Sequence, residues 1–240
     1  MRLLSAIRIY KDWLVTKVII ALKKKPFHIK TSIDYLILTF KKSGCLPAPI
    51  NALELFGMYG LWVTKHYAHY CEHVDMWEID SNYVYYARKF KEPNVTIIEG
   101  DSVLAVQNGS ISKKYNFVMI DNPLISPYGN GLIEHFDVLP QIFDIAEDKF
   151  ILIFNVLLDD PNNLYNQYHF NSEIQIRNKL QWMEKRKWFY GTKKGLNLNP
   201  QEYTKIYSDK FTKWGMEVQF STFLPRNSSV GFLGFALRRR

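Results

Sequence analysis

The chain has 240 residues, of which 47% are hydrophobic, and its formal net charge is +8. This length suffices for one substantial core, and two cysteines, Cys45 and Cys71, exclude a disulfide framework and a CxxC metal site. The best apolar stretch, from Trp13 to Leu22, is interrupted by Lys17 and is too short for a membrane-spanning helix, and no small-residue cleavage site follows it. We therefore expect one cytoplasmic domain with appendages.

The positive charge is concentrated near the N-terminus. Residues 1 to 43 contain ten Lys and Arg against two Asp, whereas the remainder contains 21 basic and 21 acidic residues. We interpret residues 1–47 as a basic helical arm and residues 48–240 as a formally neutral domain. A neutral domain argues against a nucleic-acid groove that extends across it.

Apolar residues recur at three- and four-residue steps between Leu3 and Leu22, which predicts an amphipathic helix. The stripe consists of Leu3, Ile7, Tyr10, Leu14, Val18 and Ala21. The stripe either packs on the domain, or the helix lies peripherally on an anionic membrane surface or anionic partner, helped by the lysines at 23–25. We favour packing, because most amphipathic helices face a core. A second helix is expected at Ser32–Lys42, ending before Gly44.

From residue 50 onward, short apolar runs alternate with helical stretches, which is typical of βαβ units and a parallel sheet. The expected strands are Ile50–Phe56, Val74–Glu78, Val95–Glu99, Asn116–Ile120 and Phe150–Val156. The expected helices are Leu61–Glu72, Asn82–Phe90, a short one after Asp101, and Phe136–Ala146.

The last third departs from this alternation. Residues 157–199 are polar and aromatic with a helix near Glu173–Phe189, and we interpret them as a lid or substrate insertion. Its aromatic and cationic residues either pack the helix or cover a sugar, a base or an anionic group; they are Trp182, Arg186, Trp188, Phe189 and Tyr190. A helix at Gln201–Trp214 then precedes two strands, Glu217–Leu224 and Gly231–Leu237. Their short link predicts an antiparallel hairpin.

Four polar motifs stand where predicted strands end. The first strand runs through Glu54 into a turn that contains Gly57 and Gly60, where the backbone can approach a ligand closely. Glu78 ends the second strand, 18 residues after Gly60, a spacing that suits an acid that binds ribose hydroxyls. Asp101 with Ser102, and Asp121, follow the third and fourth strands. Ligands of open parallel sheets bind at such ends.

In order and spacing these motifs resemble those of class I S-adenosylmethionine-dependent methyltransferases, over roughly residues 48–237. The resemblance implies a Rossmann-like α/β fold with a seven-stranded, mostly parallel sheet, a C-terminal antiparallel hairpin, helices on both faces, and S-adenosylmethionine as cofactor. The glycine loop is degenerate, because Phe56 and Met58 stand where the family usually has glycines.

The resemblance also implies roles for individual residues. Glu78 would bind the ribose, Asp101 and Ser102 the adenine, and Asp121 would lie near the transferable methyl group, whereas Asp80 would cap a helix. The expected cofactor-binding residues are Glu54, Phe56, Gly57, Tyr59, Gly60, Glu78, Ile79, Asp101, Ser102 and Asp121. Asp101 has a second reading as a helix cap only.

The catalytic candidates are Asp121, as anchor or base for the acceptor, and His135, as general base. A helix-cap or surface role for His135 stays open. His66, His69 and His73 are expected on one helix with Cys71 and lack a convincing ligand set, so we expect no metal.

Three functions fit the sequence. The preferred one is methyl transfer to a small-molecule or glycan-type acceptor. The second is nucleic-acid methylation, with the arm contacting phosphates. The third is a catalytically degenerate methyltransferase fold that acts as a binding protein, suggested by Phe56 and Met58.

Overall fold

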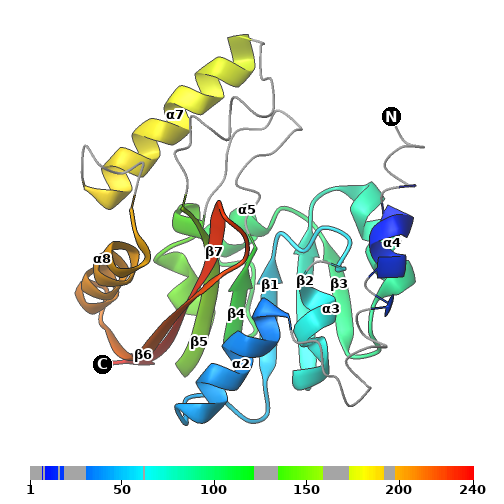
Figure 1. The fold of residues 1–240 in the computed structure, drawn as a ribbon, viewed down its shortest axis with the longest axis horizontal. Helices are drawn as coiled ribbons and strands as arrows, with labels where there is room; N and C mark the ends of the chain where they lie inside the picture. The colour runs from blue at the N-terminus through cyan, green and yellow to red at the C-terminus, as the bar shows by residue number, and fades with distance from the viewer. Residues whose placement is uncertain are drawn as a thin grey trace.

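The computed structural model describes residues 7, 9–15, 17–18, 31–61, 63–121, 135–158, 173–191 and 198–240. Its centre is one seven-stranded sheet in the order β3-β2-β1-β4-β5-β7-β6, with helices on both faces (Figure 1). The expected α/β architecture, mostly parallel with an antiparallel hairpin at the C-terminal end, is confirmed.

Five parallel strands build the first part of the sheet. They are β1 (Asn51–Leu55), β2 (His73–Glu78), β3 (Val95–Glu99), β4 (Tyr115–Ile120) and β5 (Ala146–Leu157). β7 (Val230–Arg239) pairs antiparallel with both β5 and β6 (Met216–Pro225). Because β2 and β3 extend the sheet on one side of β1 and β4 on the other, the strand order reverses between β1 and β4.

Each face of the sheet has its own set of helices. The α2 face is covered by α2 (Ser32–Lys42), α3 (Thr64–Tyr67), η1 (Ala68–Tyr70) and α4 (Ser81–Phe90). The α8 face is covered by α5 (Ser102–Gln107), η2 (His135–Asp137), η3 (Gln141–Ile145), the end of α7 (Glu173–Tyr190) and α8 (Pro200–Lys213). The rest of α7 projects away from the sheet (Figure 1).

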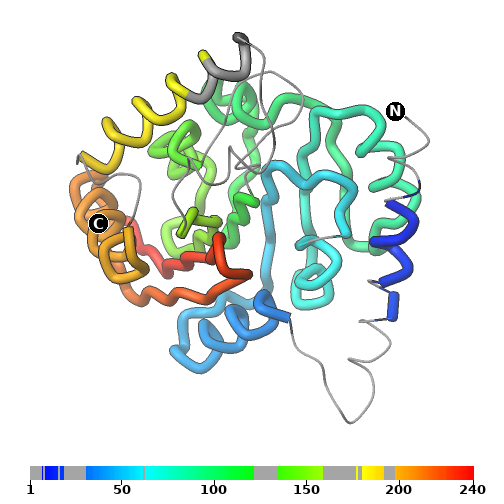
Figure 2. Tube along the Cα trace, turned by 45° about the horizontal axis from the view of Figure 1, so that its top comes forward, coloured from blue at the N-terminus to red at the C-terminus, as the bar shows by residue number. Residues whose placement is uncertain are grey.

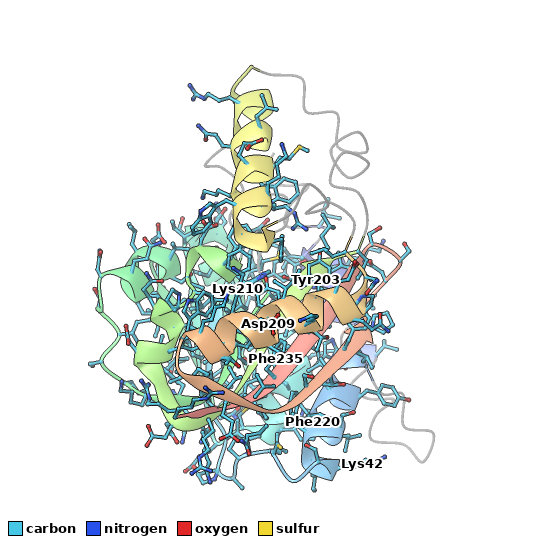
Figure 3. The ribbon with its side chains drawn as sticks, turned by 90° about the vertical axis from the view of Figure 1, so that its left-hand side faces the viewer. Lys42, Tyr203, Asp209, Lys210, Phe220 and Phe235 are labelled. Carbon is cyan, nitrogen blue, oxygen red and sulfur yellow. The ribbon has the colours of Figure 1, made fainter. Side chains whose placement is uncertain are left out.

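The C-terminal hairpin is packed on both sides. Phe235 of β7 points toward α8, where its ring lies 4.9 Å from that of Phe211, whereas Phe220 of β6 lies 5.7 Å from Phe40 of α2 (Figure 3). Such aromatic pairs bury large apolar areas and hold the two antiparallel strands between the helix layers.

Two predicted helices differ from the structure. The expected helix at Phe136–Ala146 is replaced by η2 and η3, because Pro140 lacks the N–H that a continuous helix needs, and β5 begins at Ala146. The helix expected at Leu61–Glu72 begins only at Thr64. The placement of His73 on that helix is wrong, since His73 is the first residue of β2.

The insertion expected at 157–199 is only partly described. Its helix is confirmed as α7, whereas residues 159–172 and 192–197 lie outside the described residues. Residues 122–134, the segment between Asp121 and His135, also lie outside the described residues.

The described residues 7, 9–15 and 17–18, here called the arm helix, pack against α4 (Figure 2). Ile9 and Trp13 face the body, and the Trp13 ring stacks on Phe90 with centroids 5.2 Å apart. The expectation that the stripe of Ile7, Leu14 and Val18 packs on the domain is wrong, because all three are exposed. Of the stripe, Tyr10 contacts α4 through Tyr86 and Phe90, whereas Leu3 and Ala21 lie outside the described residues.

The turn after β1 keeps a glycine-like backbone at positions without glycine. Phe56 has φ 63° and Met58 has φ 50°, both in the left-handed region, and Gly60 follows with φ 71°. A left-handed conformation costs a residue with a Cβ roughly 1–2 kcal/mol. The Phe56 side chain packs on the α8-face core, and the Met58 side chain packs with the arm helix. The turn therefore keeps the left-handed backbone typical of glycines, although Phe56 and Met58 make this conformation unfavourable.

This conformation predicts an inverted order of stability for two truncations of Met58. Both Met58→Gly and Met58→Ala remove the side chain, but only glycine adopts the positive φ freely, so we expect the Gly variant to be about 1 kcal/mol more stable than the Ala variant. Urea denaturation of the two variants measures the difference.

The exposed residue Tyr85 within α4 provides the control. There the usual helical preference should make Tyr85→Gly about 1 kcal/mol less stable than Tyr85→Ala. The same order at both positions would contradict the left-handed backbone at Met58.

Candidate functional site

Three carboxyl side chains stand at the ends of adjacent strands, at the carboxyl edge of the sheet and on the α2 face. Glu54 of β1 is in register with Met76 of β2 and Met119 of β4, both in the α2-face core. Glu78 and Asp121 each follow two residues later, and alternate residues of a strand project to the same side. The tips of three adjacent strands thus direct carboxyl groups to one face, at the reversal of strand order.

Glu78 ties the turn after β1 to the end of β2. The Met58 N–H donates to its Oε2 at 2.7 Å, and the Asp80 N–H donates to its Oε1 at 2.8 Å. Burial raises the pKa of Glu78, and these backbone donors oppose the rise. A carboxylate has about four acceptor positions, so Glu78 can accept further hydrogen bonds while it holds the turn.

Glu54 is almost fully buried, with 1% of its surface exposed. Burial raises its pKa to about 8, although hydrogen bonds from Thr64 and Tyr67 oppose this and the nearby charge of Asp121 adds to it. The Tyr67 hydroxyl donates to Oε2 at 2.8 Å. Glu54 is therefore largely protonated at neutral pH.

Asp121 follows β4 and is held by two partners that the sequence reasoning missed. Arg226 Nη1 lies 2.6 Å from its Oδ1, and Asn155 Nδ2 donates to the same oxygen at 2.8 Å. Burial raises the pKa of Asp121, and the guanidinium of Arg226 opposes the rise. Because β7 runs antiparallel to β5, the hairpin link that carries Arg226 returns to the carboxyl edge. The strand order is the signal that could have placed it there.

The acids after β2 and β3 both cap helices. Asp80 accepts the Asn82 N–H at 2.8 Å, so its expected role as the cap of α4 is confirmed. Asp101 accepts hydrogen bonds from the N–H groups of Val103 and Leu104 and caps α5, as one of its two readings expects. Contacts of Asp101 and the buried Ser102 with adenine stay predictions.

The remaining loop residues lie in different surroundings. A Cβ on Gly57 would come within 2.2 Å of the Met76 side chain, so this glycine permits the close packing of the turn on β2. Tyr59 is buried, with its hydroxyl bonded to Asp12 of the arm helix, whereas Ile79 is exposed. Tyr59 thus faces the arm, and its role toward a cofactor stays a prediction.

His135 is enclosed in the α8-face core. None of its surface is exposed, its ring stacks on Phe154 at 4.3 Å, and its Nε2 is bonded to the Tyr207 hydroxyl. Burial lowers its pKa well below the usual range, so the imidazole is neutral. The structure does not bring His135 together with the three carboxyl groups, and its role as a base stays a prediction.

The aromatic and cationic residues of α7 divide between core and surface. Trp182, Arg186, Phe189 and Tyr190 are buried, which supports the packing interpretation for them, whereas Trp188 is exposed. Within the part of the chain that the structure describes, no group of three His, Cys, Asp or Glu residues is arranged to hold a metal ion.

No model of a known protein family matches the sequence, and no curated protein matches it. Two solved structures are similar in fold, both plantazolicin methyltransferases crystallised with a desmethylPZN analog and SAH. The first, BamL, has a TM-score of 0.53 at 12% identity, over 87% of this chain and 85% of that one. The second, BpumL, has a TM-score of 0.51 at 12% identity, over 97% and 90% of the two chains. The chain therefore has the fold of class I methyltransferases.

Proposed function

We propose that this protein transfers the methyl group of S-adenosylmethionine to a small-molecule or glycan-type acceptor. The observation that carries the proposal is the placement of Glu54, Glu78 and Asp121 at adjacent strand ends, beside a turn with a glycine-like backbone. Open α/β sheets bind ligands at the carboxyl edge where the strand order reverses, and this is where the three residues lie.

The residues present fit the adenosine part of this cofactor. Glu78 would accept a hydrogen bond from the ribose at a remaining acceptor position, and the turn at 56–60 keeps the backbone that glycines would otherwise provide. Ser102, at the first turn of α5, would meet the adenine ring beside Asp101. When bound, S-adenosylmethionine supplies a methyl group on a sulfonium, and the protein has mainly to align the acceptor with it.

Asp121 is our candidate for that alignment. Its ion pair with Arg226 and its bond from Asn155 fix the carboxylate at the end of β4. There it would accept a hydrogen bond from an acceptor hydroxyl or amino group, or take its proton. We assign this contact to Asp121 rather than His135, because the imidazole is enclosed by aromatic rings.

A compact organic acceptor fits better than a nucleic acid. The domain at 48–240 is formally neutral, and nucleic-acid affinity depends on cationic phosphate contacts. The similar BamL is a plantazolicin methyltransferase, which also favours an acceptor of this kind. Heavy-methyl labelling of metabolites, lipids and RNA, read by mass spectrometry, distinguishes the acceptor classes; label in RNA alone would overturn our assignment.

The first prediction concerns cofactor binding. We expect calorimetry to detect binding of S-adenosylmethionine and of its demethylated product to the full chain. Glu78→Gln should weaken binding by about 1–3 kcal/mol, because a charge-assisted hydrogen bond is lost.

Glu99→Gln is the matched control, since Glu99 is the register partner of Glu78 on β3 and lies exposed. It should leave the affinity unchanged. Folded protein that binds neither ligand would instead support a binding protein with a degenerate methyltransferase fold.

The second prediction concerns pH. Glu54 is protonated below about 8, so its negative charge develops as the pH rises through that value. A negative charge favours a cationic ligand, and the affinity for S-adenosylmethionine should therefore rise with pH. The demethylated product lacks the sulfonium charge and should show a smaller rise. Calorimetry with Glu54→Gln, which stays neutral, should show the rise abolished; an unchanged pH dependence would disprove a role for Glu54.

The third prediction separates acceptor alignment from cofactor binding. We expect Asp121→Asn to lower the rate of methyl transfer by about 100-fold, within the range typical of a lost acid–base group, and to change cofactor affinity little. Asp209→Asn, at an exposed acid of α8, is the control and should match the unmodified chain. A thermal melt monitors folding, because the substitution removes the charge that pairs with Arg226. Equal losses in cofactor affinity and rate would assign Asp121 to cofactor binding alone.

A further inference from the structure

The arm helix has two distinct faces. One face is fixed to the body through Ile9, which is buried among Tyr59, Leu61 and Phe90. Trp13 stacks on Phe90 beside it, and Asp12 accepts a hydrogen bond from the Tyr59 hydroxyl. The helix is therefore held against α4 and the turn after β1, with its other face directed away from the domain (Figure 2).

The outer face is apolar. Ile7, Leu14, Val15 and Val18 have exposed fractions of 57%, 59%, 48% and 53%. Residues three, four and seven apart lie along one side of a helix, so Ile7, Leu14 and Val18 share one side, with the exposed Lys11 between Ile7 and Leu14. Large aliphatic side chains gathered on the exposed side of a helix are typical of an interaction site.

Cations accompany this row. Lys11 and Lys17 are exposed, and the Lys17 ammonium lies 4.2 Å from the centre of the Trp13 ring at the border between the two faces. Asp12 is the single acidic residue before Asp34 in the sequence, and it is directed toward Tyr59. The outer face of the described helix therefore combines aliphatic side chains with positive charge.

We propose that this outer face docks the protein onto an anionic lipid bilayer. Aliphatic side chains enter the boundary between headgroups and acyl chains while lysines contact anionic headgroups, and this combination defines an interfacial helix. A nucleic acid offers phosphates but no apolar boundary for Leu14 and Val18. In a symmetric pair of copies, the lysines of one chain would approach those of the other, which is unfavourable.

The mode of attachment follows from the helix itself. Within the residues that the structure describes, no helix is long and apolar enough to cross a membrane. With one face held on the domain and the other exposed, the arm helix would lie in the plane of the surface. Because Ile9 and Trp13 hold it on the domain, it is already ordered before binding, and the bilayer contact does not have to offset the cost of folding a free segment.

The test uses the full chain with phosphatidylcholine vesicles, with or without about one third phosphatidylserine, in a co-sedimentation assay. We expect binding to the anionic vesicles, reduced by added salt. The double variant Leu14→Ser/Val18→Ser should lower the partition coefficient at least about tenfold, because two insertable side chains are lost. Both residues are exposed, so the domain should melt as the unmodified chain does.

The matched control is Leu180→Ser/Trp188→Ser on α7, where both side chains are also exposed. It should bind vesicles as the unmodified chain does. Absence of binding to anionic vesicles would overturn the proposal, and so would an equal loss in both double variants. A dimer in solution that Leu14→Ser/Val18→Ser converts to a monomer would assign the face to a second copy and overturn it as well.

Discussion

The hydrogen bonds that backbone N–H groups donate to Glu78 are the contacts on which the candidate site depends. One donor is Met58 in the strained turn and another is Asp80, which caps α4. Phe56 and Met58 each lose roughly 1–2 kcal/mol in the left-handed region, and a hydrogen bond to a charged group returns about 1.5–3 kcal/mol. Glu78 therefore stabilises a turn that its own residue types disfavour, and it fixes the distance between the tips of β1 and β2.

The three carboxyl groups occupy one edge of the sheet but differ in their partners. Glu54 is protonated because it is buried with neutral hydroxyl donors, Glu78 is held by backbone donors, and Asp121 is paired with a guanidinium. Similar groups in different surroundings acquire different proton affinities, and a site needs such differences to perform different tasks. The arrangement places a neutral acid at Glu54, a carboxyl group held by backbone donors at Glu78, and an ion-paired carboxylate at Asp121.

The strands of the sheet could be predicted from the sequence because local patterns of apolar residues specify them. The bounds of β3 and α2 agree with the prediction, since apolar runs and the helix-ending Gly44 are local signals. The partners of Asp121 were not predictable in this way, because Arg226 lies 105 residues away along the chain and reaches the site only through the pairing of β7 with β5. The predicted packing of the stripe on the arm helix was wrong for a related reason. Periodicity identifies an apolar face of a helix but does not show what covers that face.

The arm helix and the candidate site are physically connected. Met58 donates its N–H to Glu78, yet its side chain packs in the same cluster as Ile9 and Trp13. Tyr59, the next residue, is bonded to Asp12 of the arm. Removal of the arm would uncover Tyr59, Leu61 and Phe90 and would take away packing that offsets the strain at Met58. The arm helix is therefore part of the folded body. The turn that Glu78 holds depends on the arm helix as well as on the sheet.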